Sequence, residues 1–170
     1  MTSESGPAEG DEYVNPEKVA ITLPDVTEFV LQSVSSGLKE PGFLADADPQ
    51  DAKFPLLGVV RGPWWRPFVV ATVTNEFIEP PISKRVVFLV DTTVPVTYLS
   101  TAILDALGFG RTPRSLEVNV HGIRVPACRS AAGFADANVL GTIFFRRSKL
   151  TLVVNFATIR VEAQLQAPNA

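Results

Sequence analysis

The sequence predicts an all-β domain, arranged as a closed barrel with one or two short helices and preceded by an acidic arm. Residues 86–90 form a run of five apolar residues, as expected for a strand that is buried on both faces. Residues 115–126 alternate apolar and polar side chains on either side of a His-Gly pair, which is typical of a β-hairpin. Residues 150–156 and 158–162 are two further strand-like segments.

The first 53 residues differ in charge from the rest of the chain. Residues 1–53 hold eleven acidic and three basic residues, whereas the remainder holds seven acidic and twelve basic ones. An acidic segment interrupted by Pro and Gly is expected to be a largely disordered arm. Within it, residues 25–38 place apolar side chains at helical spacing, with Asp25 as a candidate N-cap. We expect this short helix to dock on the chain's own core, and docking on a partner is the alternative.

An apolar segment at 54–65 connects the arm to the domain. The adjacent Trp64 and Trp65 are expected to anchor this segment against the barrel, with peptide binding as the alternative. The domain itself is expected to span residues 66–162, followed by a tail at 163–170.

Two short helices are expected within the domain. Residues 101–107 predict the first, with Ser100 or Thr101 as the N-cap and Gly108 as the C-terminal stop. Residues 142–147 predict the second, directly after an apolar strand that ends on a glycine.

Asp91 ends the apolar run and is followed by Thr92 and Thr93. A carboxylate at the end of a buried strand must be hydrogen-bonded, paired or protonated, because burying it without a partner is costly. The residues alone leave two interpretations open. Asp91 is either a reacting group or a cap of the next turn with its side chain in water.

The order of these segments resembles the retropepsin-like aspartic proteases, the family of retroviral and retrotransposon proteases and their cellular relatives. Residues 87–92 look like the strand that carries the catalytic Asp-Thr-Gly triplet. Asn138-Val139-Leu140-Gly141 looks like the hydrophobic-hydrophobic-glycine signature that braces the active-site loop. Residues 66–70 look like the opening strand, and residues 150–156 are similar to the terminal strand that many members use to dimerise. The resemblance covers residues 66–162.

The resemblance implies an aspartic endopeptidase that acts as a homodimer. Aspartic proteolysis needs two facing carboxylates that share a proton. Asp91-Thr92 is the one Asp-Thr pair in the sequence, which excludes a two-lobed enzyme within a single chain. Asp91 would therefore meet its symmetry mate in a second subunit, and Thr92 would hold the two loops together across the axis.

Two departures from the family pattern concern the substrate site. Thr93 stands where the family has Gly or sometimes Ala, and its branched side chain adds bulk where a substrate backbone would lie. Residues 108–115 are too few for the long β-hairpin flap that closes over substrate. The resemblance therefore leaves two functions open: an active peptidase, or a degenerate relative that serves as a dimerisation or protein-binding module. A third interpretation makes Asp91 a structural cap in an unrelated β-barrel binding domain.

The counts of cysteine and histidine and the distribution of basic and apolar residues limit the cofactors and partners to be expected. One cysteine, Cys128, and one histidine, His121, exclude a disulfide framework and make zinc sites and Ser or Cys triads implausible, so no cofactor is expected. His121 is expected to be an exposed turn residue. The expected partners are a second copy of the chain and a polypeptide, without nucleic acid, since the short basic run at 146–149 reads as a solvated helix end. No apolar stretch is long enough to span a membrane and no secretory signal is recognisable, which favours an intracellular, cytoplasmic location.

Overall fold

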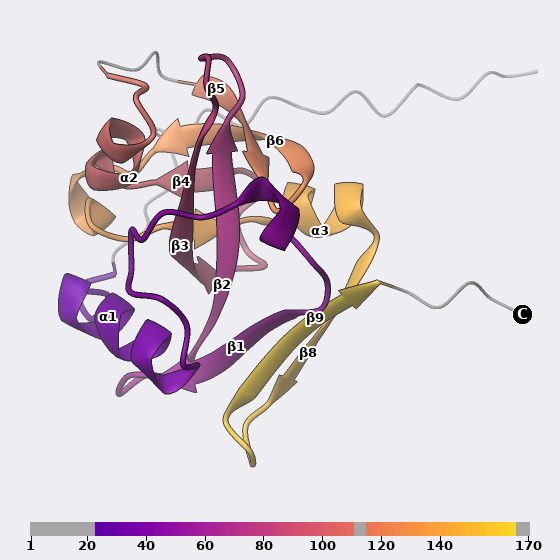
Figure 1. Ribbon diagram of the computed structural model, residues 1–170. Coiled ribbons are helices and arrows are strands. Elements are labelled where there is room, and N and C mark those ends of the chain that lie inside the picture. The colour runs from indigo at the N-terminus through magenta and orange to yellow at the C-terminus, as the bar shows by residue number, and fades with distance from the viewer. Residues whose placement is uncertain (1–22, 111–114, 166–170) are drawn as a thin grey trace, which may run out of the picture.

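The computed structural model describes residues 23–110 and 115–165. Most of these residues form strands, with a few short helices beside them, as the predicted all-β class requires (Figure 1). The strands are β1 (Leu56–Arg61), β2 (Arg66–Asn75), β3 (Ile82–Val90), β4 (Thr97–Leu99), β5 (Ser115–Val120), β6 (Ile123–Arg129), β7 (Val139–Leu140), β8 (Leu150–Asn155) and β9 (Arg160–Leu165). The helices are α1 (Glu28–Gly37), α2 (Thr101–Ala106) and α3 (Thr142–Ser148), with 3₁₀ turns η2 (Pro49–Asp51) and η3 (Ala132–Phe134).

Six of the strands pair in a ring. The ring runs from β2 to β3, β7, β4, β6 and β5 and returns to β2. From β2 the sheet also extends outward through β1 and β9 to β8, which pairs only with β9 among the described residues. In Figure 1 the β8–β9 hairpin projects from the body of the molecule. The ring agrees with the all-β prediction, but strand pairing alone does not establish a closed barrel.

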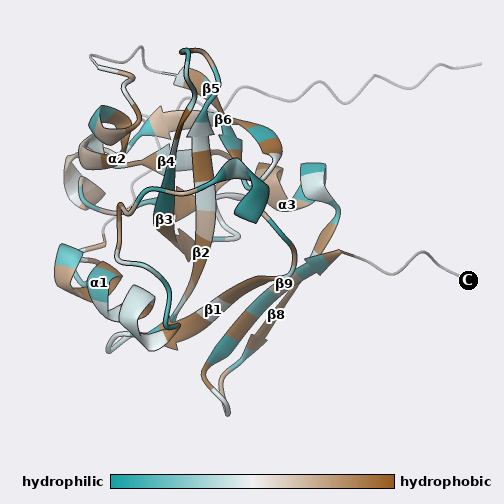
Figure 2. Ribbon diagram, in the orientation of Figure 1, coloured by the Kyte–Doolittle hydropathy of each residue, from teal (hydrophilic) through white to brown (hydrophobic). Residues whose placement is uncertain are grey.

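Strand β3 is buried on both faces, as its apolar run predicts. Phe88 and Val90 point into the main core between the strands of the ring, whereas Val87 and Leu89 point to the opposite face. Figure 2 shows the hydrophobic residues along the neighbouring strands β1 and β2. We call the cluster on the opposite face of β3 the α1-side core. Its buried members are Leu23, Val26, Leu31, Val34, Val59, Phe68, Val70, Val87, Leu89, Val94, Tyr98, Cys128, Phe134, Ala137 and Val139.

Helix α1 packs on the chain's own core, beneath the C-terminal end of β3 in Figure 1. The helix was predicted within residues 25–38 with Asp25 as its N-cap, but it begins at Glu28 and Thr27 occupies the N-cap position. The Asp25 carboxylate instead accepts two hydrogen bonds from Arg66, at 2.6 Å from Nε and 2.9 Å from Nη2. This side-chain hydrogen bonding from Arg66 holds the pKa of Asp25 below its usual value.

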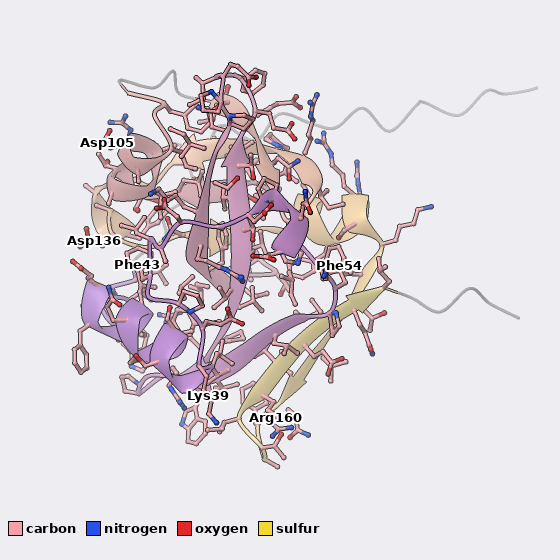
Figure 3. All side chains as sticks on the ribbon, viewed as in Figure 1. Lys39, Phe43, Phe54, Asp105, Asp136 and Arg160 are labelled. Carbon is pink, nitrogen blue, oxygen red and sulfur yellow. The ribbon has the colours of Figure 1, made fainter. Side chains whose placement is uncertain are left out.

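Residues 38–55 cross one face of the sheet as a strap, seen in front of β2 and β3 in Figure 1. Residues 44–47 run beside β3, where Leu44 N–H donates to the Arg85 carbonyl and Arg85 N–H donates to the Ala45 carbonyl. Phe43 and Phe54, labelled in Figure 3, pack against the main core from the two ends of this strap. The region from 23 to 53 is thus folded against the sheet, although composition led us to expect it within a largely disordered arm. Residues 1–22 of that arm lie outside the described residues.

The tryptophan pair does not anchor the connecting segment. Trp64 and Trp65 occupy the turn between β1 and β2, and each is 58% exposed. The guanidinium of Arg66 lies over the Trp64 ring, 4.9 Å from its centroid. The predicted anchoring is wrong because residues 56–61 form β1, which secures this segment by strand pairing instead.

His121 lies in the β5–β6 turn, as predicted, but it is buried, with 5% of its surface exposed. Its Nε2 is 2.7 Å from the Lys53 carbonyl, and its ring packs edge-on against Phe54 at 5.0 Å. The strap therefore covers the turn, which makes the expectation of an exposed histidine wrong. Burial lowers the pKa of His121, and the positive charge of Arg85 acts in the same direction, while the bond to Lys53 opposes them.

The predicted helix at 101–107, the hairpin and the two C-terminal strands are confirmed. Helix α2 is capped by Ser100, whose hydroxyl oxygen accepts a hydrogen bond from Ile103 N–H at 3.4 Å. The predicted hairpin is β5–β6, and the two C-terminal segments pair as β8 and β9. Within residues 23–110 and 115–165, none of the helices combines the length and apolar character needed to cross a lipid bilayer.

We expect stability to fall as the pH drops below about 6.5, because His121 stays neutral in the folded chain while the unfolded chain binds a proton. The free energy of unfolding, measured by urea titration, should decrease by at most about 1.4 kcal/mol per pH unit from this histidine. The His121→Asn variant, whose side chain suits the positive φ of this turn, should be less stable but should lose that slope between pH 7 and 5. An equal slope in both proteins would contradict the assignment.

Candidate active site

Asp91 lies directly after β3, on the face covered by α1. Its N–H donates to the Leu140 carbonyl at 3.2 Å, so the ladder between β3 and β7 continues one residue past the strand. Because side chains alternate along a strand, Asp91 shares the face of Val87 and Leu89. The carboxylate is partly exposed and stands at the edge of the α1-side core.

Thr93 holds one oxygen of this carboxylate. Its N–H and its hydroxyl both donate to Asp91 Oδ1, at 2.8 and 2.6 Å. No described residue hydrogen-bonds to Oδ2. Thr93 does not adopt a positive φ, so the turn does not need the family's glycine at this position. Thr92 is exposed beside it, and its role across a dimer axis stays a prediction.

Asn138 ties three segments together behind this loop. Its side chain is fully buried, and its Oδ1 accepts a hydrogen bond from Ser100 N–H at 2.8 Å. Its Nδ2 donates to the Val87 carbonyl at 3.3 Å, and its own carbonyl accepts from Leu89 N–H at 2.8 Å. These bonds fix β7 between β3, which runs parallel to it, and β4, where Tyr98 pairs with Val139.

Gly141 allows the chain to pass directly against the segment that follows Asp91. A Cβ at this position would lie 2.3 Å from the Val96 carbonyl oxygen and 2.6 Å from the Pro95 carbonyl oxygen. Both are backbone atoms that a side chain cannot displace without shifting the loop. The glycine is required here by close approach, not by a positive φ.

The first turn of α3 completes the support. Helix N-termini carry amides without partners in the helix itself. Here Thr142 N–H donates to the Val94 carbonyl at 2.9 Å, and Ile143 N–H donates to the Pro95 carbonyl at 3.0 Å. The loop after Asp91 is therefore held in two ways, by the close approach of Gly141 and by hydrogen bonds from the first turn of α3.

The structure thus brings Asp91 beside the segment from Asn138 to Gly141, and Thr93 hydrogen-bonds to the Asp91 carboxylate. Sequence reasoning missed the Asp25–Arg66 ion pair at this end of β2, because its two members are far apart in the chain and carry no local pattern. The interval between α2 and β5 that was expected to lack a flap spans residues 107–114, and residues 111–114 of it lie outside the described residues.

No protein-family model matches this chain, and no curated protein matches it. A solved structure described as a retropepsin-like aspartic protease from Rickettsia conorii is similar at 14% identity and a TM-score of 0.47. That similarity covers 66% of this chain and 90% of the other one.

We expect Gly141→Ala to destabilise the protein by about 1–3 kcal/mol, because the new methyl group collides with two backbone carbonyls. The free energy of unfolding in urea measures the effect. Gly42→Ala is the matched control, since a Cβ there meets only the end of the Gln32 side chain at 3.8 Å. Equal stability of the two variants would mean that the brace does not constrain the loop.

Proposed function

We propose that residues 66–162 form a retropepsin-like aspartic endopeptidase domain, a single-lobed acid protease barrel that hydrolyses peptide bonds as a homodimer. The observation that carries the proposal is the way the Asp91 loop is held. Groups that do not touch the carboxylate, namely Asn138, Gly141 and the first turn of α3, fix the loop from behind. A reacting group needs such positioning, whereas a simple turn cap does not.

The chemistry follows from one carboxylate per subunit. In the homodimer, Asp91 and its symmetry mate would share one proton, because two like charges in contact cannot both stay ionised. The ionised member would activate a water molecule, and the protonated member would donate to the carbonyl of the scissile bond. The two apparent ionisations of such a pair belong to the pair as a whole.

The edge of β8 supports the proposed homodimer. Within the described part of the chain this strand pairs with β9 on one side only. Val153 on β8 and Leu57 on β1 flank Glu162 of β9 on one face of the sheet, and both apolar side chains are exposed. An open, apolar edge strand favours pairing with another chain. A second copy adding its own β8 would extend the sheet around a two-fold axis.

A second candidate is a catalytically degenerate domain that serves as a dimerisation or protein-binding module. The Thr93 hydroxyl favours it, because its bond to Asp91 Oδ1 at 2.6 Å is one that the family's glycine cannot make. This bond occupies a carboxylate oxygen that the reaction would use. Activity measurements separate the two candidates.

We expect Asp91→Asn to lower the rate of cleavage of an unfolded polypeptide such as casein at least hundredfold, because an amide cannot share the proton. Cleavage by the parent should peak at acid pH and be inhibited by a pepstatin-type compound. Asp105→Asn is the matched control, since Asp105 is an exposed carboxylate on α2 (Figure 3). A parent protein that dimerises but cleaves nothing at any pH would establish the degenerate candidate instead.

We expect Val153→Lys to weaken the homodimer at least tenfold, because it sets like charges near each other across the proposed β8–β8 contact. Within the monomer the new lysine lies opposite Glu162, so folding should not suffer. Sedimentation equilibrium measures the dissociation constant, and cleavage at low protein concentration should fall in parallel. Phe77→Lys is the control, since Phe77 is 68% exposed beyond β2. Equal dimerisation of the two variants would remove β8 from the interface.

A further inference from the structure

Helix α1 covers the apolar surface that surrounds the candidate catalytic carboxylate. Leu31 and Val34 of α1 are buried in the α1-side core. The same core contains Leu89, two residues before Asp91, and Val94, three residues after it. The side chain of Asp91 belongs to this face by strand alternation. The helix therefore packs on the apolar core that extends to both sides of Asp91 along the chain.

The ion pair before α1 holds the same end of the sheet. Phe68 of β2 pairs with Leu89 of β3, and continuing this register sets Arg66 across from Asp91. Arg66 shares the face of Phe68, again by alternation. Asp25 binds the Arg66 guanidinium with both carboxylate oxygens, and the side chains of Arg66 and Asp25 are largely buried. A carboxylate of the N-terminal segment is thus fixed next to the site.

Two of the four buried side-chain polar atoms without a hydrogen-bond partner in the described residues belong to α1 and to a residue of the α1-side core. The hydroxyls of Ser35 on α1 and Tyr98 on β4 are both buried, and neither has a hydrogen-bond partner. Buried hydroxyls without partners are costly and rare in permanent cores. The middle of a helix offers no free main-chain partner to such a hydroxyl, because its amides and carbonyls bond to one another. An extended polypeptide carries free amides and carbonyls that can bond to the Tyr98 hydroxyl.

Helix α1 is joined to the sheet in a way that permits it to leave. Residues 38–42, the first part of the strap, connect the helix to the part that is bonded to β3, and Lys39 among them has a φ of 57°. The strap beyond the link has its own hydrogen bonds to β3 through Leu44, Ala45 and Ala47. Release of residues 23–38 therefore breaks the side-chain packing of the helix, the Asp25–Arg66 pair and the hydrogen bond from Leu23 N–H to the Gly133 carbonyl at 3.2 Å, while the strap stays bound.

We propose that residues 23–38 are a displaceable occupant of the polypeptide-binding surface beside Asp91, and that the described structure is the closed form of the site. This inference rests on the proposed peptidase function. The polypeptide that replaces the segment is extended and apolar, with a carboxylate that takes the place of Asp25 on Arg66. Release of α1 then exposes Leu89, Val94 and the Tyr98 hydroxyl to that polypeptide.

Binding of a fluorescein-labelled peptide with the sequence of residues 23–38 tests the inference in the full chain. Asp91→Asn is present in every protein, so that cleavage does not interfere. Adding Leu31→Ala or Asp25→Asn weakens the hold on the chain's own segment, and either should tighten peptide binding at least tenfold. Phe29→Ala is the matched control on the same helix, because Phe29 is 82% exposed, and it should bind like the parent.

Labelling of Cys128 by a thiol reagent gives a second readout. This thiol is buried in the α1-side core, and burial raises its pKa, so labelling of the parent should be slow. Leu31→Ala and Asp25→Asn should label at least tenfold faster than Phe29→Ala. Equal peptide binding in all four proteins, or faster labelling without tighter binding, would overturn the inference.

Cleavage assays with Asp91 restored separate this inference from the proposed function. Faster casein cleavage by Leu31→Ala and Asp25→Asn, suppressed by the added peptide, supports both. Tighter peptide binding without cleavage in any variant supports displacement and removes the peptidase proposal. If the parent cleaves casein as fast as Leu31→Ala and Asp25→Asn do, the peptidase proposal stands and the proposed displacement of residues 23–38 is wrong.

Discussion

The structure around Asp91 depends on the fit of β7 between β3 and β4. Two residues long, this strand is parallel to one neighbour and antiparallel to the other, and it closes the ring of six strands. The residues on either side of β7 make the fit possible. The Asn138 side chain hydrogen-bonds to backbone groups of β3 and of the residue after β4. Gly141 lies so close to two backbone carbonyls that any side chain there would collide with them. Because interiors are close-packed, a change at either flank moves the loop that carries the carboxylate.

The second constraint is that β3 is apolar on both faces. The ring of strands buries one face of β3, so a further element of the chain must cover the other face. Here α1 and the strap do so, and the acidic residues of the strap meet basic residues of β3. Asp46 pairs with Lys84 at 2.6 Å, and Glu40 pairs with Arg85 at 3.2 Å. The charge excess that suggested disorder is thus partly matched across the fold, which composition cannot reveal.

Local patterns predicted β3, the β5–β6 hairpin, the C-terminal strands β8 and β9 and the short helices, because alternation, caps and glycine turns are encoded within a few residues. They did not predict β1, which was expected as a connecting segment. They did not predict the burial of His121, since the Lys53 carbonyl and the Phe54 ring that cover it come from the distant strap. The meeting of Asp91 with Gly141 has no local signal either. It was expected only from the order of motifs, and the ion pair of Asp25 with Arg66 was not expected at all.

The position of α1 reconciles two requirements that otherwise conflict. A surface that binds extended polypeptides must be apolar and must offer hydrogen-bonding groups, and such a surface promotes aggregation when it faces water. A helix covers the apolar part but has few free main-chain groups, and the buried Tyr98 hydroxyl of the same core has no hydrogen-bond partner. In the proposed displacement, an incoming extended polypeptide would supply one. In this proposal residues 23–38 either stabilise the single chain by covering the surface, or leave it and give a polypeptide access to Asp91.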